Sequence, residues 1–458
     1  MEVNVEDVSP VKKTLKVTVP ASEVDKALDR AYKGLKTQVR VKGFRPGKAP
    51  RSVLEGMYKK DVSQDVASKL VNDSFPEALR ETELRVVGTP DVDPPEPVQG
   101  RDFTYEAEVE VFPELPELNL AGLELKRPRY EATQDEIDNQ LEMLRKNMGH
   151  LKPVEEDRPV AEGDFALIDY EGADEQSQRA GVGQTEDFTL EIGSGKILKE
   201  FDEQVVGMKP GETRIIEVTF PEDYFNKELA GKNVRFSVTL KEIREQELPP
   251  LDDELAKDMG EYETLDELKD VIRKHLQEGY DKRADQVVEE QIYRQLLDQV
   301  DFEVPDTLVE HELESMMEES ERALAYRNMT FEDAGTTKEE MRERYRDTAV
   351  KQVRRYIILD TIIDQEDLEL SEETMDEAFE NMAAQVRQPK DVVRQHYERN
   401  QEQLSMFRHT LLQKEALDHI KRLADLKTVP PEEIEEETEN AGESEPAADA
   451  ADAAREAE

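Results

Sequence analysis

One segment of the chain places an aromatic side chain beside two cations on a backbone that is both bent and stiff. The segment is Gly43-Phe44-Arg45-Pro46-Gly47-Lys48-Ala49-Pro50. Its glycines permit sharp turns and its prolines restrict the backbone, so an exposed tip of this kind loses little entropy on docking. Arg and Lys pair with phosphates or carboxylates. The residues alone allow two interpretations, an ordinary connection between two helices or a docking loop.

The residues around this loop predict a mixed α/β head over residues 1–112. Leu15, Val17 and Val19 alternate with polar residues as in a half-buried strand, and residues 103–111 repeat that period. One helix is expected after Ser22, before the loop. A second helix is expected after it, with an apolar face formed by Val53, Leu54, Met57, Val62, Val66 and Leu70.

Charge is distributed unevenly along the chain. The net charge of the 458 residues is −48, yet residues 1–60 hold 14 Lys or Arg against 7 Asp or Glu. The segment 431–458 holds 12 acidic residues and one Arg. A basic island on an acidic protein indicates one polyanionic partner for that island, whereas the acidic remainder would repel nucleic acid. We therefore expect no binding to DNA.

Composition excludes several classes of protein. The chain has no Cys, which rules out disulfide scaffolds, thiolate zinc sites and cysteine nucleophiles. No apolar run is long enough for a membrane span, and the acidic start is unlike a secretory signal. The six histidines lack metal-ligand spacing. We expect a cytoplasmic protein without a metal or a cofactor, and with no membrane partner.

Two further segments with different sequence patterns follow the head. After a helical stretch within 113–152, residues 153–247 show short alternating strands with Gly-containing turns, which predicts a small β-rich domain. Residues 248–430 form a helical domain, with a helical pattern almost without interruption from 251 to 426. Capping-box patterns occur at Thr264/Glu267 and Thr337/Glu340, and Pro305 and Pro389 break the pattern. Residues 431–458 predict a disordered acidic tail. The fold class is multidomain α+β.

The segment 43–50, in this order of domains, resembles the ribosome-binding signature of bacterial trigger factors, and the resemblance extends up to the acidic tail. It implies a ribosome-binding head, an inserted isomerase domain and a helical domain with extended arms, to which 113–152 would contribute the first part. It also implies docking on protein and ribosomal RNA near the exit tunnel of the large ribosomal subunit, and unfolded nascent chains as clients. The implied contact and shaping residues are Gly43, Phe44, Arg45, Pro46, Gly47, Lys48 and Pro50.

Residues 153–247 are similar to the FKBP type of peptidyl-prolyl isomerase. The positions that match its pocket are Tyr170, Phe188, Ile197, Leu198, Phe201, Tyr224 and Phe236. A dry aromatic pocket lowers the rotation barrier, since it disfavours the polar double-bond form of the amide. The family's Phe followed by an acidic residue is missing from 175–183. The isomerase activity could therefore be weak. The alternative role for these aromatics is to fill the core of a small domain.

The helical domain carries no catalytic constellation, but it is rich in methionine. Met259, Met316, Met317, Met329, Met341, Met375, Met382 and Met406 are candidates either for helix packing or for an adaptable client surface. We expect an ATP-independent, ribosome-associated chaperone with prolyl isomerase activity. The resemblance further implies links to protein export and cell division, and allows a homodimer away from the ribosome. Two alternatives remain: a free cytosolic prolyl isomerase whose helical domain only recruits substrates, and an acidic scaffold.

Overall fold

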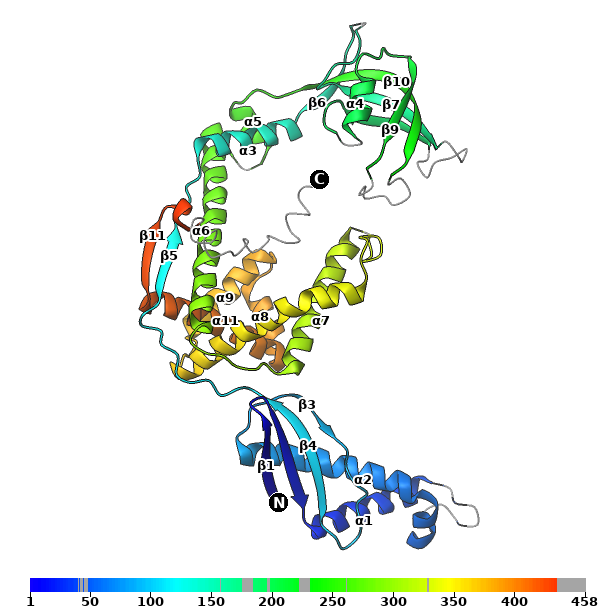
Figure 1. Cartoon of the computed structure of the whole chain (residues 1–458), viewed down its shortest axis with the longest axis vertical. Helices are drawn as coiled ribbons and strands as arrows, with labels where there is room; N and C mark the ends of the chain where they lie inside the picture. Colours follow the sequence, from blue (N-terminus) through cyan, green and yellow to red (C-terminus); the bar gives the residue numbers. More distant parts are fainter. Residues whose placement is uncertain are drawn as a thin grey trace. The chain divides into compact units, whose positions relative to one another are not determined.

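The computed structural model describes residues 1–39, 41, 44, 48–156, 158–174, 184–195, 198–221, 231–260, 262–327 and 329–434. The chain forms two compact units: residues 1–127 with 287–428, and residues 128–286 with the segment from Val429. Figure 1 labels most elements of both units. The helix α6 (Leu265–Leu297) contributes residues to each of them. The predicted boundaries at 112, 152, 247 and 430 are not tested by this division and stay predictions.

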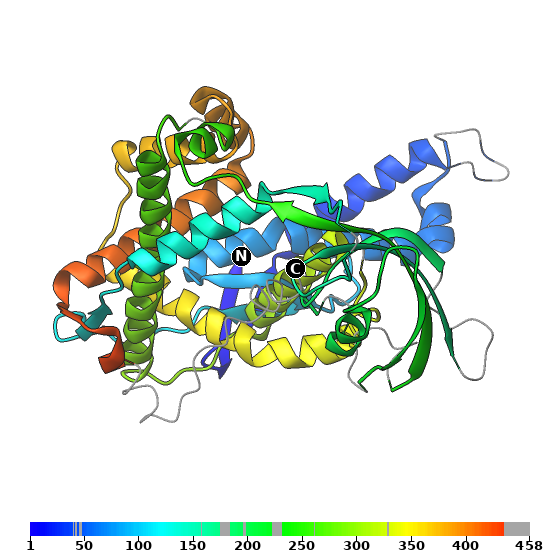
Figure 2. The same ribbon diagram turned by 90° about the horizontal axis from the view of Figure 1, so that it is seen from above.

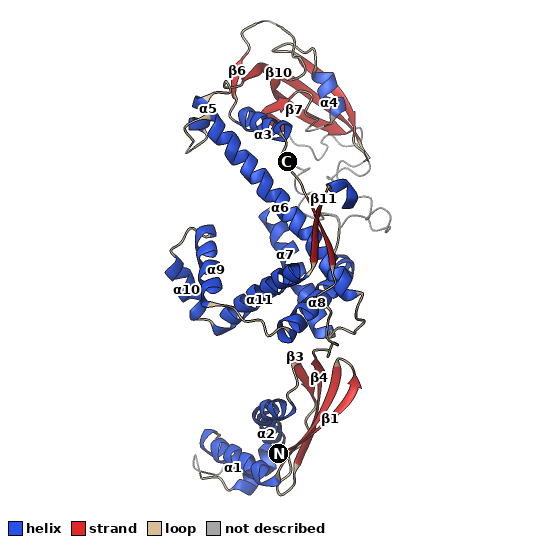
Figure 3. Ribbon diagram, turned by 90° about the vertical axis from the view of Figure 1, so that its left-hand side faces the viewer, coloured by secondary structure: helices blue, strands red, loops and turns tan. Residues whose placement is uncertain are grey.

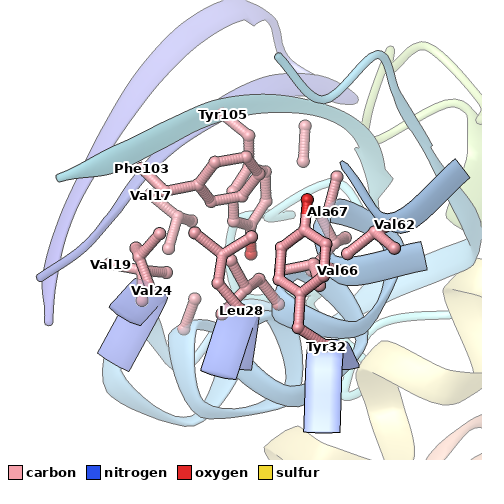
Figure 4. Close-up of a cluster of buried hydrophobic side chains, with 14 of the residues drawn as sticks. Val17, Val19, Val24, Leu28, Tyr32, Val62, Val66, Ala67, Phe103 and Tyr105 are labelled. Atoms are coloured by element: carbon pink, nitrogen blue, oxygen red, sulfur yellow. The ribbon is translucent and has the colours of Figure 1, made fainter. Parts of the chain in front are cut away.

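The head (residues 1–112) is an antiparallel sheet with two helices packed against it. The strand order is β1-β2-β4-β3. Side chains from the sheet and from both helices meet in one apolar core (Figure 4). The elements are β1 (Glu2–Ser9), β2 (Lys12–Val19), α1 (Ala21–Gln38), α2 (Arg51–Thr82), β3 (Val86–Val92) and β4 (Phe103–Val111).

The strand β4 shows how the sequence pattern determines this core. Phe103, Tyr105, Ala107, Val109 and Val111 are each 3% exposed or less, and the residues between them face away. The predicted alternation is therefore confirmed. The buried Tyr105 hydroxyl lies 2.9 Å from the Ser74 hydroxyl on α2, which satisfies both polar groups inside the core.

The helix α2 departs from the predicted pattern at one point. Tyr58 has non-helical dihedral angles (φ −128°, ψ 18°), so a kink separates the first turns from the rest of the helix. Leu54 before the kink and Val62 after it are buried, but Met57 is 57% exposed. The prediction of Met57 on the buried face was wrong, because the short segment before the kink contacts the core through Val53 and Leu54 and not through Met57. The first helix also begins earlier than expected, with Pro20 rather than Ser22 as its N-cap.

The rest of the first unit is mostly helical, and its two larger apolar clusters lie around α8. Leu118, Leu120, Leu123 and Leu125 pack against α6, α8 and α11, and a second cluster joins α7 to α8. The strand β5 pairs with β11. The elements are β5 (Glu124–Pro128), α7 (Asp306–Tyr326), α8 (Lys338–Gln365), α9 (Glu372–Gln385), α10 (Lys390–Glu398), α11 (Gln401–Leu423) and β11 (Asp425–Val429).

Local sequence signals set several of the helix ends. Thr337 and Glu340 form the predicted reciprocal capping box at the start of α8. Pro305 and Pro389 are the N-caps of α7 and α10, as the two predicted breaks require. The Thr264 hydroxyl accepts the Glu267 backbone N–H at 3.3 Å, so this half of the second box also forms.

The second unit contains the β-rich domain (residues 153–247), whose curved sheet, in shades of green, is clear in Figure 2. The strand order is β6-β10-β7-β8, and β9 also pairs with β10. A separate small cluster joins α3, α5 and the first half of α6. The elements are α3 (Gln134–Asn147), β6 (His150–Pro153), β7 (Phe165–Asp174), β8 (Gln184–Glu191), α4 (Lys199–Val205), β9 (Thr213–Thr219), β10 (Asn233–Glu247) and α5 (Asp253–Asp258).

The predicted acidic tail is described only at its start. Residues 431–434 form a helical turn, and the remainder of 431–458 lies outside the described residues. None of the described helices combines the length and the apolar composition that a bilayer span requires.

Candidate functional site

The docking segment 43–50 joins two helices whose ends are well defined. The Val39 N–H caps α1 by donating to the Leu35 carbonyl at 3.0 Å. Pro50 is the N-cap of α2, and its carbonyl accepts the Val53 and Leu54 N–H groups at 3.2 and 3.3 Å. Both ends of the loop are therefore attached to rigid elements of the head.

Arg51, which the sequence analysis did not select, connects the two helices at the base of the loop. Its guanidinium donates to Glu55 on its own helix at 2.6 Å and to Asp29 on α1. It also lies 5.1 Å from the centre of the Tyr32 ring, where a cation is attracted by the aromatic face. The hydrogen bond to Glu55, followed by that to Asp29, raises the pKa of Arg51. This residue therefore fixes the spacing of the helices that carry the loop.

Three of the seven predicted docking residues lie within the described part of the loop. Phe44 is 41% exposed, Lys48 is exposed, and Pro50 starts α2. Gly43, Arg45, Pro46 and Gly47 lie outside the described residues. An aromatic ring in water at a loop tip is unusual for a residue that only connects two helices, because burial would stabilise it.

The end of the head around this loop combines exposed apolar and basic side chains. Met57, before the kink in α2, is exposed like Phe44. Lys33 on α1 and Lys59 and Lys60 on α2 are also exposed. This mixture suits a surface that carries negative charge together with apolar patches, such as a complex of RNA with protein.

In the β-rich domain, four aromatic rings from four different elements converge. The Tyr170 ring on β7 meets the Phe188 ring on β8 at 5.6 Å and 90°, and the Phe236 ring on β10 at 6.0 Å. The Phe236 ring also meets the Phe201 ring on α4 at 5.4 Å and 84°. Each positive ring edge thus faces a negative ring face. The four side chains form one continuous apolar surface.

Differences in exposure divide this surface into a floor and a rim. Phe201 and Phe236 are 0% and 2% exposed and form the floor, whereas Tyr170 and Phe188 are half-buried. A domain that used these rings only to fill its core would bury all four. The half-buried pair therefore offers an aromatic wall to a ligand.

The remaining pocket positions are only partly described. Leu198 is half-buried and begins α4, beside the floor. Ile197 and Tyr224 lie outside the described residues. Phe220, which was not selected from sequence, is 2% exposed and meets the Phe236 ring at 6.3 Å, so it extends the floor. The structure thus brings together five of the seven predicted positions.

A buried carboxylate on α4 holds the turn that follows β8. Asp202 on α4 is 3% exposed, and its Oδ2 accepts the N–H groups of Gly193 at 3.1 Å and of Gly195 at 2.8 Å. Gly193 has φ +94°, and an added Cβ would meet the Glu162 side chain at 2.9 Å. Only glycine fits there without strain. The Gly193-Ser194-Gly195 turn was visible in the sequence, but its attachment to Asp202 was not.

The helices α9, α10 and α11 lie next to one another in the helical domain (Figure 3). A groove is lined by residues of these helices and of the segment before α9. The groove has a volume of about 880 Å³, and Met375, Phe379, Leu404 and Leu412 supply apolar lining. Its charged lining residues are Glu369, Glu372, Glu373, Asp376, Glu377, Glu380, Glu398, Lys390, Arg394 and Arg408. Carboxylates thus outnumber cations around an apolar floor.

The candidate methionines of the helical domain divide into packed and exposed residues. Met317 is only 9% exposed and belongs to the helix core. Met406 is 62% exposed and Met329 is 37% exposed, near Tyr326, which is 92% exposed. Met375 and Met382 pack partly against a small cluster around Phe379. Among the described residues, no group of three or more His, Asp or Glu side chains is placed to hold a metal ion.

Comparison with known proteins covers nearly the whole chain. Family models described as bacterial trigger factor protein and its C-terminus match residues 1–144 and 264–422, and one for FKBP-type peptidyl-prolyl cis-trans isomerase matches residues 156–241. A protein named trigger factor in Desulfatibacillum aliphaticivorans is 56% identical over 429 residues, which is 94% of this chain and 98% of that protein.

Two further relatives agree with this match, and one solved structure is similar over much of its length. Proteins named trigger factor in Desulfosudis oleivorans and Desulforapulum autotrophicum are 45% and 41% identical, over 91% and 96% of this chain and 94% and 98% of their own lengths. A solved structure from work on the trigger factor chaperone shares 20% identity over 92% of this chain and 99% of that chain. Its TM-score of 0.47 is too low to support a conclusion by itself. On the family models and the sequence relatives, this chain belongs to the trigger factor family.

Proposed function

We propose that this protein is an ATP-independent chaperone that docks on the large ribosomal subunit, holds emerging polypeptides, and isomerises their prolyl bonds. The observation that carries the proposal is the full-length match to the trigger factor family, with the segment 43–50 intact in the head. The free prolyl isomerase is the weaker reading, because it gives the docking segment and the long helical domain no necessary role.

Docking would use the tip of the head. Phe44 is exposed and can enter an apolar cavity on a ribosomal protein, while Lys48 and the lysines of α1 and α2 can approach phosphates or acidic side chains. The Arg51 contacts to both helices reduce the freedom that the loop loses on binding, which favours affinity. Contacts to both ribosomal protein and ribosomal RNA near the exit tunnel agree with this mixed chemistry.

Client binding would use the helical domain. The groove between α9, α10 and α11 and the exposed side chains of Tyr326, Met329 and Met406 give scattered apolar contacts. Flexible methionines can repack against different partners, which suits unfolded nascent chains of many sequences. Contacts of this kind are individually weak, so a client can leave and fold.

Isomerisation would use the rim and floor of the aromatic pocket. The rotation barrier of roughly 18–20 kcal/mol arises from C–N double-bond character, which water favours because that form is polar. A proline held against the half-buried rings of Tyr170 and Phe188, which pack on the buried Phe236, would lose water and with it part of that preference. The twisted amide is less polar and is held better than the planar one.

The test is co-sedimentation with ribosomes over a series of salt concentrations. The chain is compared with a variant carrying Phe44→Ala, Arg45→Ala and Pro46→Ala. A matched control carries Val8→Ala and Lys16→Ala, which remove an exposed apolar residue and an exposed cation elsewhere in the head. Circular dichroism checks that all three proteins fold.

We expect the unmodified chain and the control to sediment with ribosomes while the triple variant stays in the supernatant. If all three sediment alike, the loop is only a connection and the docking proposal fails. A cytoplasmic location stays a prediction from composition. A homodimer away from the ribosome and roles in protein export and cell division stay predictions from the family resemblance.

A further inference from the structure

The pairing of β7 with β8 contains an irregularity beside the aromatic pocket. Ile168 pairs with Phe188, and Tyr170 pairs with Thr185. One residue of β7, Asp169, therefore stands opposite two residues of β8, Glu186 and Asp187. This arrangement is a β-bulge, and such bulges re-aim side chains next to functional sites.

The bulge contains a backbone conformation that is unfavourable for its residue. Asp187 has φ +55°, in the left-handed region that glycine normally occupies. It directly precedes Phe188, which forms the rim of the pocket. A positive φ in a residue other than glycine persists only where its surroundings hold it.

An ion cluster on the outer face of the sheet holds this conformation. The Asp187 N–H donates to the Asp169 carboxylate at 2.8 Å. The Lys241 ammonium lies 2.7 Å from that same carboxylate and 2.8 Å from the Asp187 carboxylate. Lys241 lies in a second bulge, in β10. Leu240 pairs with Ile168 and Glu242 pairs with Leu167, so Lys241 has no pairing partner on β7. Irregularities in both neighbours of β7 thus meet at Asp169.

The bulge decides which side chains face the pocket. Ile168 and Tyr170 lie on one face of β7, and Phe188 and Leu190 lie on the same face of β8. In a regular ladder, alternation would place Glu186 opposite Tyr170, on the pocket face. The extra residue places Thr185 there instead, and Glu186 is exposed. A carboxylate is thereby kept out of an apolar site.

We propose that Lys241, Asp169 and Asp187 form a lock that maintains this bulge, and that Lys241 is a positioning residue for prolyl isomerisation. The lock holds Phe188 edge-on against Tyr170 and keeps the Glu186 carboxylate out of the pocket. This inference rests on the proposed isomerase function of the pocket. It means that three polar residues, on the face of the sheet opposite the aromatic rings, affect catalysis by positioning Phe188.

The first variant is Lys241→Met, which keeps an apolar stem and removes the charge. Without the ammonium, two neighbouring carboxylates face each other and the positive φ of Asp187 loses its support. The second variant adds Asp187→Gly, because glycine adopts the positive φ freely and removes one carboxylate. Lys152→Met is the matched control, since it removes an ion pair with Glu247 at the other end of the sheet.

Activity is measured on the full chain with a Phe-Pro tetrapeptide, by NMR exchange between its cis and trans forms. A cross-peak between the labelled rings of Tyr170 and Phe188 reports on the bulge, and thermal unfolding reports on stability. We expect Lys241→Met to lower kcat/KM at least tenfold and to weaken the cross-peak. The added Asp187→Gly should restore both to within about threefold, and Lys152→Met should change neither.

Two results overturn the inference. Wild-type activity and cross-peak in Lys241→Met would show that the bulge needs no lock. A loss that follows the melting temperature and that Asp187→Gly does not restore would show a purely structural role. If the unmodified chain itself is inactive while its cross-peak is present, the proposed pocket function fails together with the catalytic role of the lock, although the bulge itself is intact.

Discussion

The two classes of ring in the aromatic pocket should respond differently to truncation. Phe201 is fully buried, so Phe201→Ala should cost the β-rich domain about 3–5 kcal/mol of unfolding free energy. That is a large share of a typical domain stability of roughly 5–15 kcal/mol. Phe188 is half-buried, so Phe188→Ala should cost about half as much, roughly 2 kcal/mol, including about 0.5–1.5 kcal/mol for its edge-on contact with Tyr170.

Loss of isomerase activity should not follow loss of stability: Phe188→Ala, the less destabilised variant, should still lose activity. The activity is measured well below the melting temperatures, where both variants remain folded. Phe188 forms the rim that a proline would contact, so Phe188→Ala should lower kcat/KM at least about tenfold, or about 1.4 kcal/mol of transition-state stabilisation. Ile215→Ala serves as the control, because Ile215 is 69% exposed on the same domain and lies outside the pocket. The assay is NMR exchange of a prolyl tetrapeptide, with unfolding followed by circular dichroism.

A folded Phe188→Ala variant with wild-type activity would refute this reasoning. It would mean that the four rings only fill the core of a small domain, and that any isomerase activity arises elsewhere. An activity loss that exceeds the loss expected from the unfolded fraction would support the aromatic wall.

Three further predictions concern the other parts of the chain. At high salt, Phe44→Ala should weaken ribosome binding more than Lys48→Ala. Salt screens ionic contacts beyond about 8 Å at 0.15 M and at shorter range above that concentration, but it does not screen apolar burial. Equal losses of binding in sedimentation over a salt series would contradict this prediction. The hydrogen bond from Arg158 lowers the pKa of Asp164 in the folded protein below its unfolded value of about 3.9. The ionised Asp164 therefore stabilises the fold above that pH, and this stabilisation is lost as the pH falls below it. In chemical denaturation, Asp164→Asn should reduce the loss of unfolding free energy at acid pH. Tyr105→Phe should cost the head about 1 kcal/mol in urea unfolding, and an unchanged midpoint would show that its buried hydroxyl contributes nothing.

Local patterns in the sequence were sufficient wherever neighbouring residues determine the structure. The alternation along β4 predicted the buried face of the head, and Thr337 with Glu340 predicted the start of α8. Pro305 and Pro389 marked helix starts because proline cannot continue a preceding helix. The order of a basic head, a β-rich insertion and a helical domain followed from the changes in sequence pattern along the chain. The docking role of the segment 43–50 stays a prediction.

Only the tertiary structure decided how the functional side chains are held. The bulge at Asp187 depends on Lys241, which is 54 residues away in sequence, and the turn before α4 depends on Asp202. The exposure of Met57 beside the buried Leu54 depends on how the first turns of α2 pack against the head. Sequence periodicity reports which face of an element is buried, because burial repeats with the geometry of that element. It does not report which distant groups meet on the other face, since those contacts arise only when strands pair and helices pack.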